Sequence, residues 1–127
     1  MTVIGIGTDI VEIARLAHGL ERFGRAYAGR ILSPEELLSF PRARNQVRFL
    51  ALRFAAKEAV AKAFGTGFRD GLGLRQIGVT HDRKGKPGLR YHGRAAELAD
   101  ALGVTESHLS LADERAYAIA FVTLVAA

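Results

Sequence analysis

Residues 45–64 read NQVRFLALRFAAKEAVAKAF, and they predict the longest helix of the chain. The stretch is rich in Ala, Leu and Phe, and Gly65 directly after it is a typical C-terminal stop. Residues four apart lie on the same face of a helix, so Arg53 is paired with Lys57 and Glu58 with Lys62. The fold class follows from what stands on either side of this helix.

Before the long helix, Val3 to Val11 is dense in Val and Ile and predicts a buried strand. Its glycines, Gly5 and Gly7, weaken a strand unless another group approaches closely. Two helical pieces are expected at residues 13–23 and 27–32. Ser33-Pro34-Glu35-Glu36 then predicts a capped helix start, and Pro41 keeps that helix short.

After the long helix, the sequence predicts a glycine-rich loop followed mostly by hairpins. Strands are expected at residues 76–81, 89–92, 108–111 and 117–125, and a short helix at residues 94–102. Turns are expected at residues 84–88 and 113–115. The prediction is therefore an α+β fold, a single domain over residues 1–127 in which one N-terminal strand, a helical middle and β-hairpins build an antiparallel sheet.

The composition narrows the class of protein. The chain has 127 residues, 49% hydrophobic and 24% charged, which is typical of one soluble globular domain. It has no cysteine, which excludes disulfides, thiolate metal sites and a cysteine nucleophile. We see no signal peptide and no transmembrane stretch, and a cytoplasmic location fits. The net charge of +5 favours an anionic partner, such as nucleic acid, a phosphorylated cofactor, a membrane surface or an acidic protein. The net charge alone does not choose among these four classes.

Two acids, Asp9 and Glu58, stand in apolar stretches, where a solvated carboxylate is not expected. Burying an unpaired charge is costly, so such acids have a cation, a metal or a proton as partner. Together they could hold one Mg²⁺. The simpler interpretations are that Glu58 forms a surface pair with Lys62, and that Asp9 ends its strand and caps the next helix.

Other candidate groups each have a simpler interpretation as well. Gly65-Thr66-Gly67 follows a helix end rather than a strand, so it is neither a Walker loop nor a dinucleotide fingerprint, and it could be only a turn. The basic turn Lys84–Pro87 could contact a phosphate or be solvated. Arg15, His18, Arg22 and Arg25 lie on one stripe, which is either a solvated face or a docking surface for an acidic partner. His108, in an apolar strand, is expected to be structural.

The chain resembles the holo-acyl-carrier-protein synthases. The resemblance rests on five segments in the family's order: IGIGTDIVE at 4–12, RFAAKEA at 53–59, KAFGTG at 62–67, Gly85-Lys86-Pro87, and the hairpin from His108–Leu111 to Tyr117-Ala118. It covers nearly the whole chain. The first two segments are highly specific at this spacing, and they favour a functional role for Asp9, Glu58 and Lys62.

The resemblance implies an Mg²⁺-dependent transfer of 4′-phosphopantetheine from coenzyme A to a serine of apo-acyl carrier protein, in the service of fatty acid synthesis. It implies a homotrimer with sites between subunits, and neither nucleic acid nor membrane as partner. Asp9 from one subunit and Glu58 from its neighbour would be the metal ligands. With Lys62, which would contact the diphosphate, they would be the catalytic residues.

The resemblance also implies two further groups of site residues. Arg44, Arg53, Gly65, Thr66 and Gly67 would lie along coenzyme A, with Lys86 and Pro87 from the other side of the interface. The arginine stripe, meaning Arg15, Arg22 and Arg25, would receive the acidic carrier protein.

One turn departs from the family pattern. Many members carry a hydroxyl residue and then His where this chain has Ala112 and Asp113. An acid near a phosphate is unfavourable, so we expect Asp113 to point away or to pair with an arginine. Two other functions remain open from the sequence: a non-catalytic basic domain that binds an acidic protein or nucleic acid, and an Mg²⁺-dependent hydrolase of the coenzyme's diphosphate.

Overall fold

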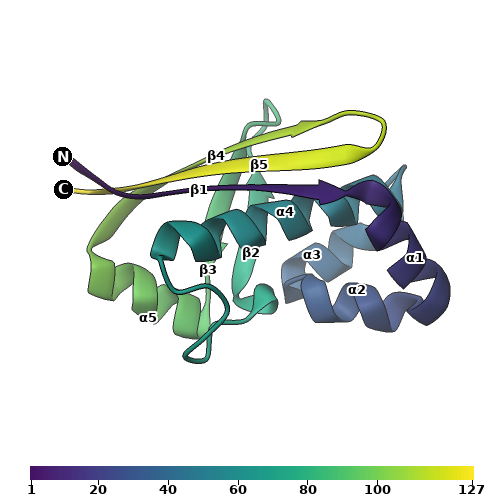
Figure 1. Ribbon diagram of the computed structural model, residues 1–127, viewed down its shortest axis with the longest axis horizontal. Helices are drawn as coiled ribbons and strands as arrows, with labels where there is room; N and C mark the ends of the chain where they lie inside the picture. Colours follow the sequence, from purple (N-terminus) through teal and green to yellow (C-terminus); the bar gives the residue numbers. More distant parts are fainter.

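A three-stranded antiparallel sheet lies along one side of the long helix α4 and forms the frame of the molecule (Figure 1). The structure is a computed structural model that describes all of residues 1–127. Its elements, in chain order, are β1 (Thr2–Glu12), α1 (Ile13–Phe23), α2 (Arg25–Ile31), α3 (Pro34–Ser39), the 3-10 turn η1 (Phe40–Arg42), α4 (Gln46–Phe64), the 3-10 turn η2 (Leu74–Gln76), β2 (Ile77–His81), β3 (Pro87–Tyr91), α5 (Gly93–Leu102), β4 (Val104–Asp113) and β5 (Tyr117–Ala126).

The strands form two antiparallel sheets rather than one. The larger sheet has the order β1-β5-β4, and β2 and β3 form a separate hairpin. Alternate residues of β5 are buried against α4, namely Ala118, Ala120, Val122 and Leu124. The predicted α+β class and the antiparallel pairing are confirmed. The strand predicted at 108–111 is longer, because the polar residues before it also join the ladder with β5.

The contact between β1 and α4 is unusually close because it is made by small residues. A Cβ atom added to Gly7 would clash with the carbonyl oxygen of Ala59, and one added to Gly5 would clash with that of Ala63. The two glycines in an otherwise β-branched strand are thus explained by the approach of the helix backbone. We call this contact the glycine seam. It brings the strand residue that follows, Asp9, up to the helix.

The helical middle follows the capping signals of the sequence. The Ser33 hydroxyl accepts a hydrogen bond from the backbone N–H of Glu36 at 3.3 Å, and the Glu36 carboxylate accepts one from the backbone N–H of Ser33 at 2.8 Å. Gly65 ends α4 in the left-handed region, with φ of 82°. No helix in the structure combines the length and the apolar character needed to cross a membrane.

Candidate active site

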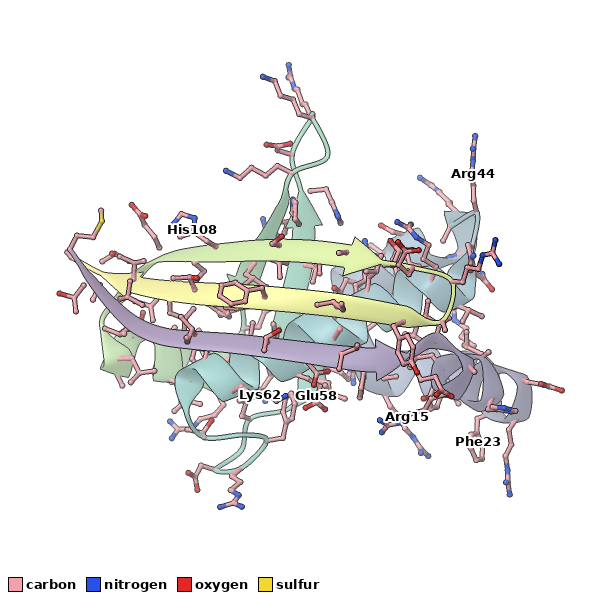
Figure 2. All side chains as sticks on the ribbon, turned by 45° about the horizontal axis from the view of Figure 1, so that its top comes forward. Arg15, Phe23, Arg44, Glu58, Lys62 and His108 are labelled. Atoms are coloured by element: carbon pink, nitrogen blue, oxygen red, sulfur yellow. The ribbon has the colours of Figure 1, made fainter.

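The first candidate group lies beside the glycine seam, where β1 meets α4. Side chains alternate along a strand, so Asp9 points to the same side as Gly5 and Gly7, toward the helix. Lys62 donates hydrogen bonds from Nζ to Asp9 Oδ1 at 3.0 Å and to the carbonyl oxygen of Thr8 at 2.9 Å. Glu58 lies one helical turn before Lys62, and both lie along the same edge of α4 (Figure 2).

The two carboxylates of this group influence each other. Burial raises the pKa of Glu58, the negative charge of Asp9 raises it further, and the positive charges of Lys62 and Arg15 oppose the shift. Glu58 forms no salt bridge of its own, whereas Asp9 is paired with Lys62. Asp9 and Glu58 therefore lie close together and share the field of one lysine.

A single chain brings Asp9 and Glu58 close together, so two subunits are not needed to supply the two acids. Two simpler interpretations of these acids are wrong. Lys62 pairs with Asp9 rather than with Glu58. Asp9 does not cap a helix, because β1 continues to Glu12, which takes the cap position of α1. The strand continues past Asp9 because β1 pairs with β5 as far as Glu12, which lies opposite Tyr117.

The donor set of this group suits a hard divalent cation. Asp9 and Glu58 offer carboxylate oxygens at a half-buried edge, and Mg²⁺ is commonly held by one or two carboxylates together with water and substrate phosphates. No third His, Cys, Asp or Glu joins them to make a complete protein cage. The residues present therefore fit a metal ion that shares its coordination with a phosphorylated substrate.

The second candidate group lines a cavity of about 530 Å³ near the N-terminal end of α4. The cavity lies between α4, the β2–β3 hairpin and β4, and its wall includes Arg44, Arg48, Phe49, Arg53, His81, Pro87 and Asp113. An adjoining cavity of about 590 Å³ is lined in part by His81, Lys86, Pro87 and His108. The two cavities share His81 and Pro87 and form one basic depression. Pro87 lies with Arg44 and Arg53 in the first cavity, and Lys86 lines only the second.

Two arginines of this cavity are held by neighbouring groups. Asp113 accepts two hydrogen bonds from the Arg48 guanidinium, at 2.7 and 3.0 Å, so the expectation that it pairs with an arginine is confirmed. The Arg53 guanidinium lies 3.4 Å from the centre of the Phe49 ring. Its Nε is buried without a hydrogen bond, 3.8 Å from the Glu36 carboxylate. Burial lowers the pKa of Arg53, which shows how far it is removed from water.

The two groups face different directions on one chain. Arg53 and Glu58 are five residues apart on α4, so they lie about 7.5 Å apart along its axis and about 140° apart around it. Arg44 and Gly65–Gly67 flank the two ends of this helix, which spans about 28 Å. Figure 2 shows Arg44 pointing away from Glu58 and Lys62. The residues expected along coenzyme A are therefore brought together in part: Arg44, Arg53 and Pro87 share the cavity, while Gly65, Thr66 and Gly67 lie at the end of α4 near Lys62.

The arginine stripe is exposed along α1 and the start of α2. Arg15 lies with its guanidinium 5.4 Å from the centre of the Phe54 ring, one turn before Glu58 on α4. Phe23, between Arg22 and Arg25, is 53% exposed, which is high for a large apolar side chain. The stripe thus surrounds an apolar residue and reaches the edge of the first candidate group.

Sequence reasoning missed three residues. Lys57 was placed with Arg53 on one helix face, but it is fully buried and pairs with Glu36. His81 lines both cavities and went unnoticed in its short strand. His108 was expected to be structural, yet its side chain is 57% exposed and pairs with Glu106. The only signal for Lys57 was its position within an alanine-rich stretch.

Comparison with known proteins assigns the family. Residues 5–122 match the 4′-phosphopantetheinyl transferase superfamily. The chain belongs to this superfamily. It is 59% identical over 123 residues to the holo-[acyl-carrier-protein] synthase of Halorhodospira halophila, covering 97% of this chain and 98% of that protein.

Solved structures agree with this membership of the phosphopantetheinyl transferases. The crystal structure of the synthase from Neisseria meningitidis matches with a TM-score of 0.92 and 47% identity, over 98% of this chain and 99% of that one. The synthase of Helicobacter pylori, solved in complex with coenzyme A, matches with a TM-score of 0.82 and 29% identity, over 94% of this chain and 99% of that one. The chain is therefore an enzyme of the phosphopantetheinyl transferase class.

Proposed function

We propose that this protein transfers 4′-phosphopantetheine from coenzyme A to a serine of apo-acyl carrier protein and depends on Mg²⁺ to do so. The observation that carries the proposal is the pairing of Asp9 and Glu58 beside Lys62, in a chain of this superfamily. The serine oxygen forms a bond to the pantetheine-side phosphorus, its hydroxyl proton passes to solvent, and the bond from that phosphorus to the bridging oxygen breaks. Adenosine 3′,5′-bisphosphate leaves, and the modified carrier protein serves fatty acid synthesis.

The residues of the first group supply charge and position rather than covalent chemistry. Asp9 and Glu58 would hold the Mg²⁺ ion, which when bound offsets negative charge on the diphosphate. Lys62 is 54% exposed in its side chain, so its ammonium is free to reach substrate oxygens beside Asp9. Phosphoryl transfer needs positioning and electrostatic stabilisation above all, which this group provides.

The separation of the two candidate groups favours a site built by two copies of the chain. The cavity with Arg44, Arg53 and Pro87 would take one part of coenzyme A from one subunit. Asp9, Glu58, Lys62 and the Gly65–Gly67 loop of the next subunit would take the diphosphate. This division is compatible with the positions of Arg53 and Glu58, which are five residues and therefore about 140° apart around the axis of α4.

The outer face of the large sheet supports such an assembly. Every helix lies on the same side of this sheet, and no element covers the other side (Figure 1). That open face carries exposed apolar side chains, which are Ile6 (62%), Ile10 (59%), Tyr117 (46%), Ile119 (41%) and Phe121 (45%). A contiguous apolar patch on a soluble protein marks an interaction site. We assign it to further copies of the chain, which would form the homotrimer.

The arginine stripe would receive the carrier protein. Arg15, Arg22 and Arg25 present three positive charges, and Phe23 offers an apolar contact among them. Complementary charge speeds the encounter of two proteins and fixes their orientation. An Arg22→Glu variant should therefore weaken use of carrier protein more than use of coenzyme A, and the difference should shrink as salt is raised.

The test is mass spectrometry of apo-acyl carrier protein incubated with this protein, coenzyme A and Mg²⁺, with an EDTA control. We expect a phosphopantetheinyl mass gain on one serine, lost with EDTA and lost in a Glu58→Gln variant. Glu97→Gln is a matched control, since Glu97 is exposed on α5 and pairs only with Arg94. No mass gain with folded protein and several carrier proteins would refute the proposal, and coenzyme A turnover without carrier protein would indicate a hydrolase instead.

A further inference from the structure

A fully buried ion pair holds α4 on the side away from the glycine seam. Lys57 is 0% exposed in its side chain and donates from Nζ to Glu36 Oε1 at 2.7 Å. The same ammonium donates to the carbonyl oxygens of Leu74, at 3.2 Å, and of Ile77. All three of its donors are thus used, which is what a buried ammonium requires.

The carboxylate of Glu36 is equally committed. Oε1 also accepts from the backbone N–H of Ser33 at 2.8 Å, and Oε2 accepts from the backbone N–H of Val79 at 2.8 Å. The Arg53 guanidinium stands 3.8 Å from Oε2. One carboxylate therefore joins the start of α3, the middle of α4 and strand β2. We call Glu36 and Lys57 the buried clamp.

The buried clamp and the glycine seam hold opposite sides of one helix. Successive residues of an α-helix are about 100° apart, so Lys57 points about 160° away from Ala59, which lies at the seam. The seam is a contact between glycines and alanines, which lack long side chains that could interlock. It sets how near α4 comes to β1, but it does little to stop the helix from rolling about its axis.

Rolling of α4 would move the first candidate group. Glu58 follows Lys57 in sequence, so its side chain points about 100° around the helix axis from that of Lys57. If the helix rolls, both side chains turn by the same angle. Asp9 is on a different element and does not follow the helix. The relative placement of Asp9 and Glu58 therefore depends on what fixes the roll of α4.

We propose that the buried clamp of Glu36 and Lys57 is a positioning device that fixes the roll of α4 and so holds Glu58 opposite Asp9 for the metal ion. The inference rests on the proposed function, because it assumes that the two carboxylates share a metal. Stability alone gives little reason for a buried ion pair, since apolar replacement of both partners is often neutral or stabilising. Charged partners with fixed hydrogen-bond directions do, however, specify one orientation.

The test uses a double variant, Glu36→Gln with Lys57→Met, in the full-length chain. The glutamine amide keeps an oxygen that can accept from Val79, and the variant removes both charges of the clamp together. The Arg53 guanidinium stays in place without its carboxylate neighbour. Mn²⁺ is titrated in the presence of coenzyme A and followed by electron paramagnetic resonance. We expect the Mn²⁺ affinity to fall by about 10-fold or more, the scale seen for residues that orient metal ligands. The KM for metal should rise, while kcat at saturating metal should change less.

Leu50→Ala is the matched control, because Leu50 is fully buried on α4 but takes no part in the clamp. It should lower the melting temperature and leave the Mn²⁺ affinity unchanged. A folded double variant with wild-type Mn²⁺ affinity would overturn the inference. If it does not fold, Lys57→Arg is used, because it keeps a cation for Glu36 but changes the length and hydrogen-bond directions of the side chain. It should also lower the Mn²⁺ affinity, and a folded Lys57→Arg variant with wild-type Mn²⁺ affinity would overturn the inference. If the wild-type protein binds no Mn²⁺, or Glu58→Gln binds it as well as wild type, the proposed metal site itself has failed.

Discussion

Two lysines of α4, five residues apart, form ion pairs of nearly equal length in opposite surroundings. Lys57 lies 2.7 Å from Glu36, with the two side chains 0% and 3% exposed. Lys62 lies 3.0 Å from Asp9, with side chains 54% and 16% exposed. The distance between nitrogen and oxygen is thus nearly the same in the two ion pairs, and the exposure of their side chains is what differs.

The difference shows which pair is free to take part in chemistry. A buried pair has given up its hydration and is very costly to separate, so Lys57 is fixed in place. A partly exposed pair contributes little to stability and exchanges its partners readily with water or ligand. The two proposals thus give the lysines of one helix different roles: Lys57 would hold the helix in position, and Lys62 would contact the substrate.

The largest effect should come from breaking the buried pair on one side only. Lys57→Met leaves the buried Glu36 carboxylate with only the Arg53 guanidinium, 3.8 Å away, as a cation. We expect a loss of about 3–5 kcal/mol in the free energy of unfolding. Chemical denaturation at neutral pH measures it. Adding Glu36→Gln should restore much of the loss, because the buried charge is then removed. A loss below about 1 kcal/mol for Lys57→Met would mean that burial does not make the Lys57 pair more important for stability than the Lys62 pair.

The exposed pair should behave in the opposite way. If Lys62 contacts the diphosphate as proposed, Lys62→Met removes a positive charge beside it. We then expect transfer to fall by about 10²–10³-fold, or about 2.7–4 kcal/mol of activation free energy. The free energy of unfolding should change by less than about 1 kcal/mol. Transfer rates at saturating coenzyme A and denaturation curves on the same preparation give both numbers. Full transfer activity in the variant would remove Lys62 from the site.

Much of the fold could be predicted because its signals are local. The capping box at Ser33 and Glu36 and the stop at Gly65 depend on residues near in sequence, and both are found. The glycines of β1 predicted a close approach without naming the approaching group. Their partner, the backbone of α4 at Ala59 and Ala63, is more than 50 residues away, and the sequence gives no sign of that pairing.

The candidate site could be predicted only through resemblance, and only in part. Spacing on a helix predicted that Lys62 faces Glu58, but its strongest partner comes from another element, Asp9 on β1. Lys57 was expected near Arg53, because residues four apart lie on the same helix face. Helix periodicity does not show which charged residue has a buried partner, so the burial of Lys57 was missed. That partner, Glu36, was already explained as a helix cap, so nothing pointed to its second role.

A substitution at the seam should disturb the exposed pair and spare the buried one. Gly7→Ala places a methyl group against the carbonyl oxygen of Ala59, so β1 must move away from α4. We expect a loss of about 1–3 kcal/mol in the free energy of unfolding, as for other overpacked contacts. Transfer should fall as well, because Asp9 moves with the strand.

The control for this prediction is Gly29→Ala, at a glycine where an added Cβ meets no atom within 4 Å. It should leave stability and transfer close to wild type. If Gly7→Ala is as mild as Gly29→Ala, the close approach of β1 and α4 does not hold Asp9 in place.

The smallest effect should come from a third pair, Arg48 with Asp113, which is as short as the buried pair at 2.7 Å but 52% and 24% exposed. If burial rather than distance determines how much an ion pair stabilises the fold, Asp113→Asn should lower the free energy of unfolding by only about 0.2–1 kcal/mol at pH 7.

The contribution of this pair should also depend on pH, because the hydrogen bond from Arg48 lowers the pKa of Asp113 in the folded protein. The contribution is therefore present above the unfolded pKa of about 3.9 and is lost as the pH falls through the folded value. Urea denaturation at pH 7 and in acid should show the gap between wild type and variant closing in acid. The control is Asp100→Asn, at an exposed aspartate without a salt bridge, which should be as stable as wild type at both pH values. If Asp113→Asn loses as much stability as Lys57→Met, the distance between the charged atoms, and not burial, determines the contribution of the pair.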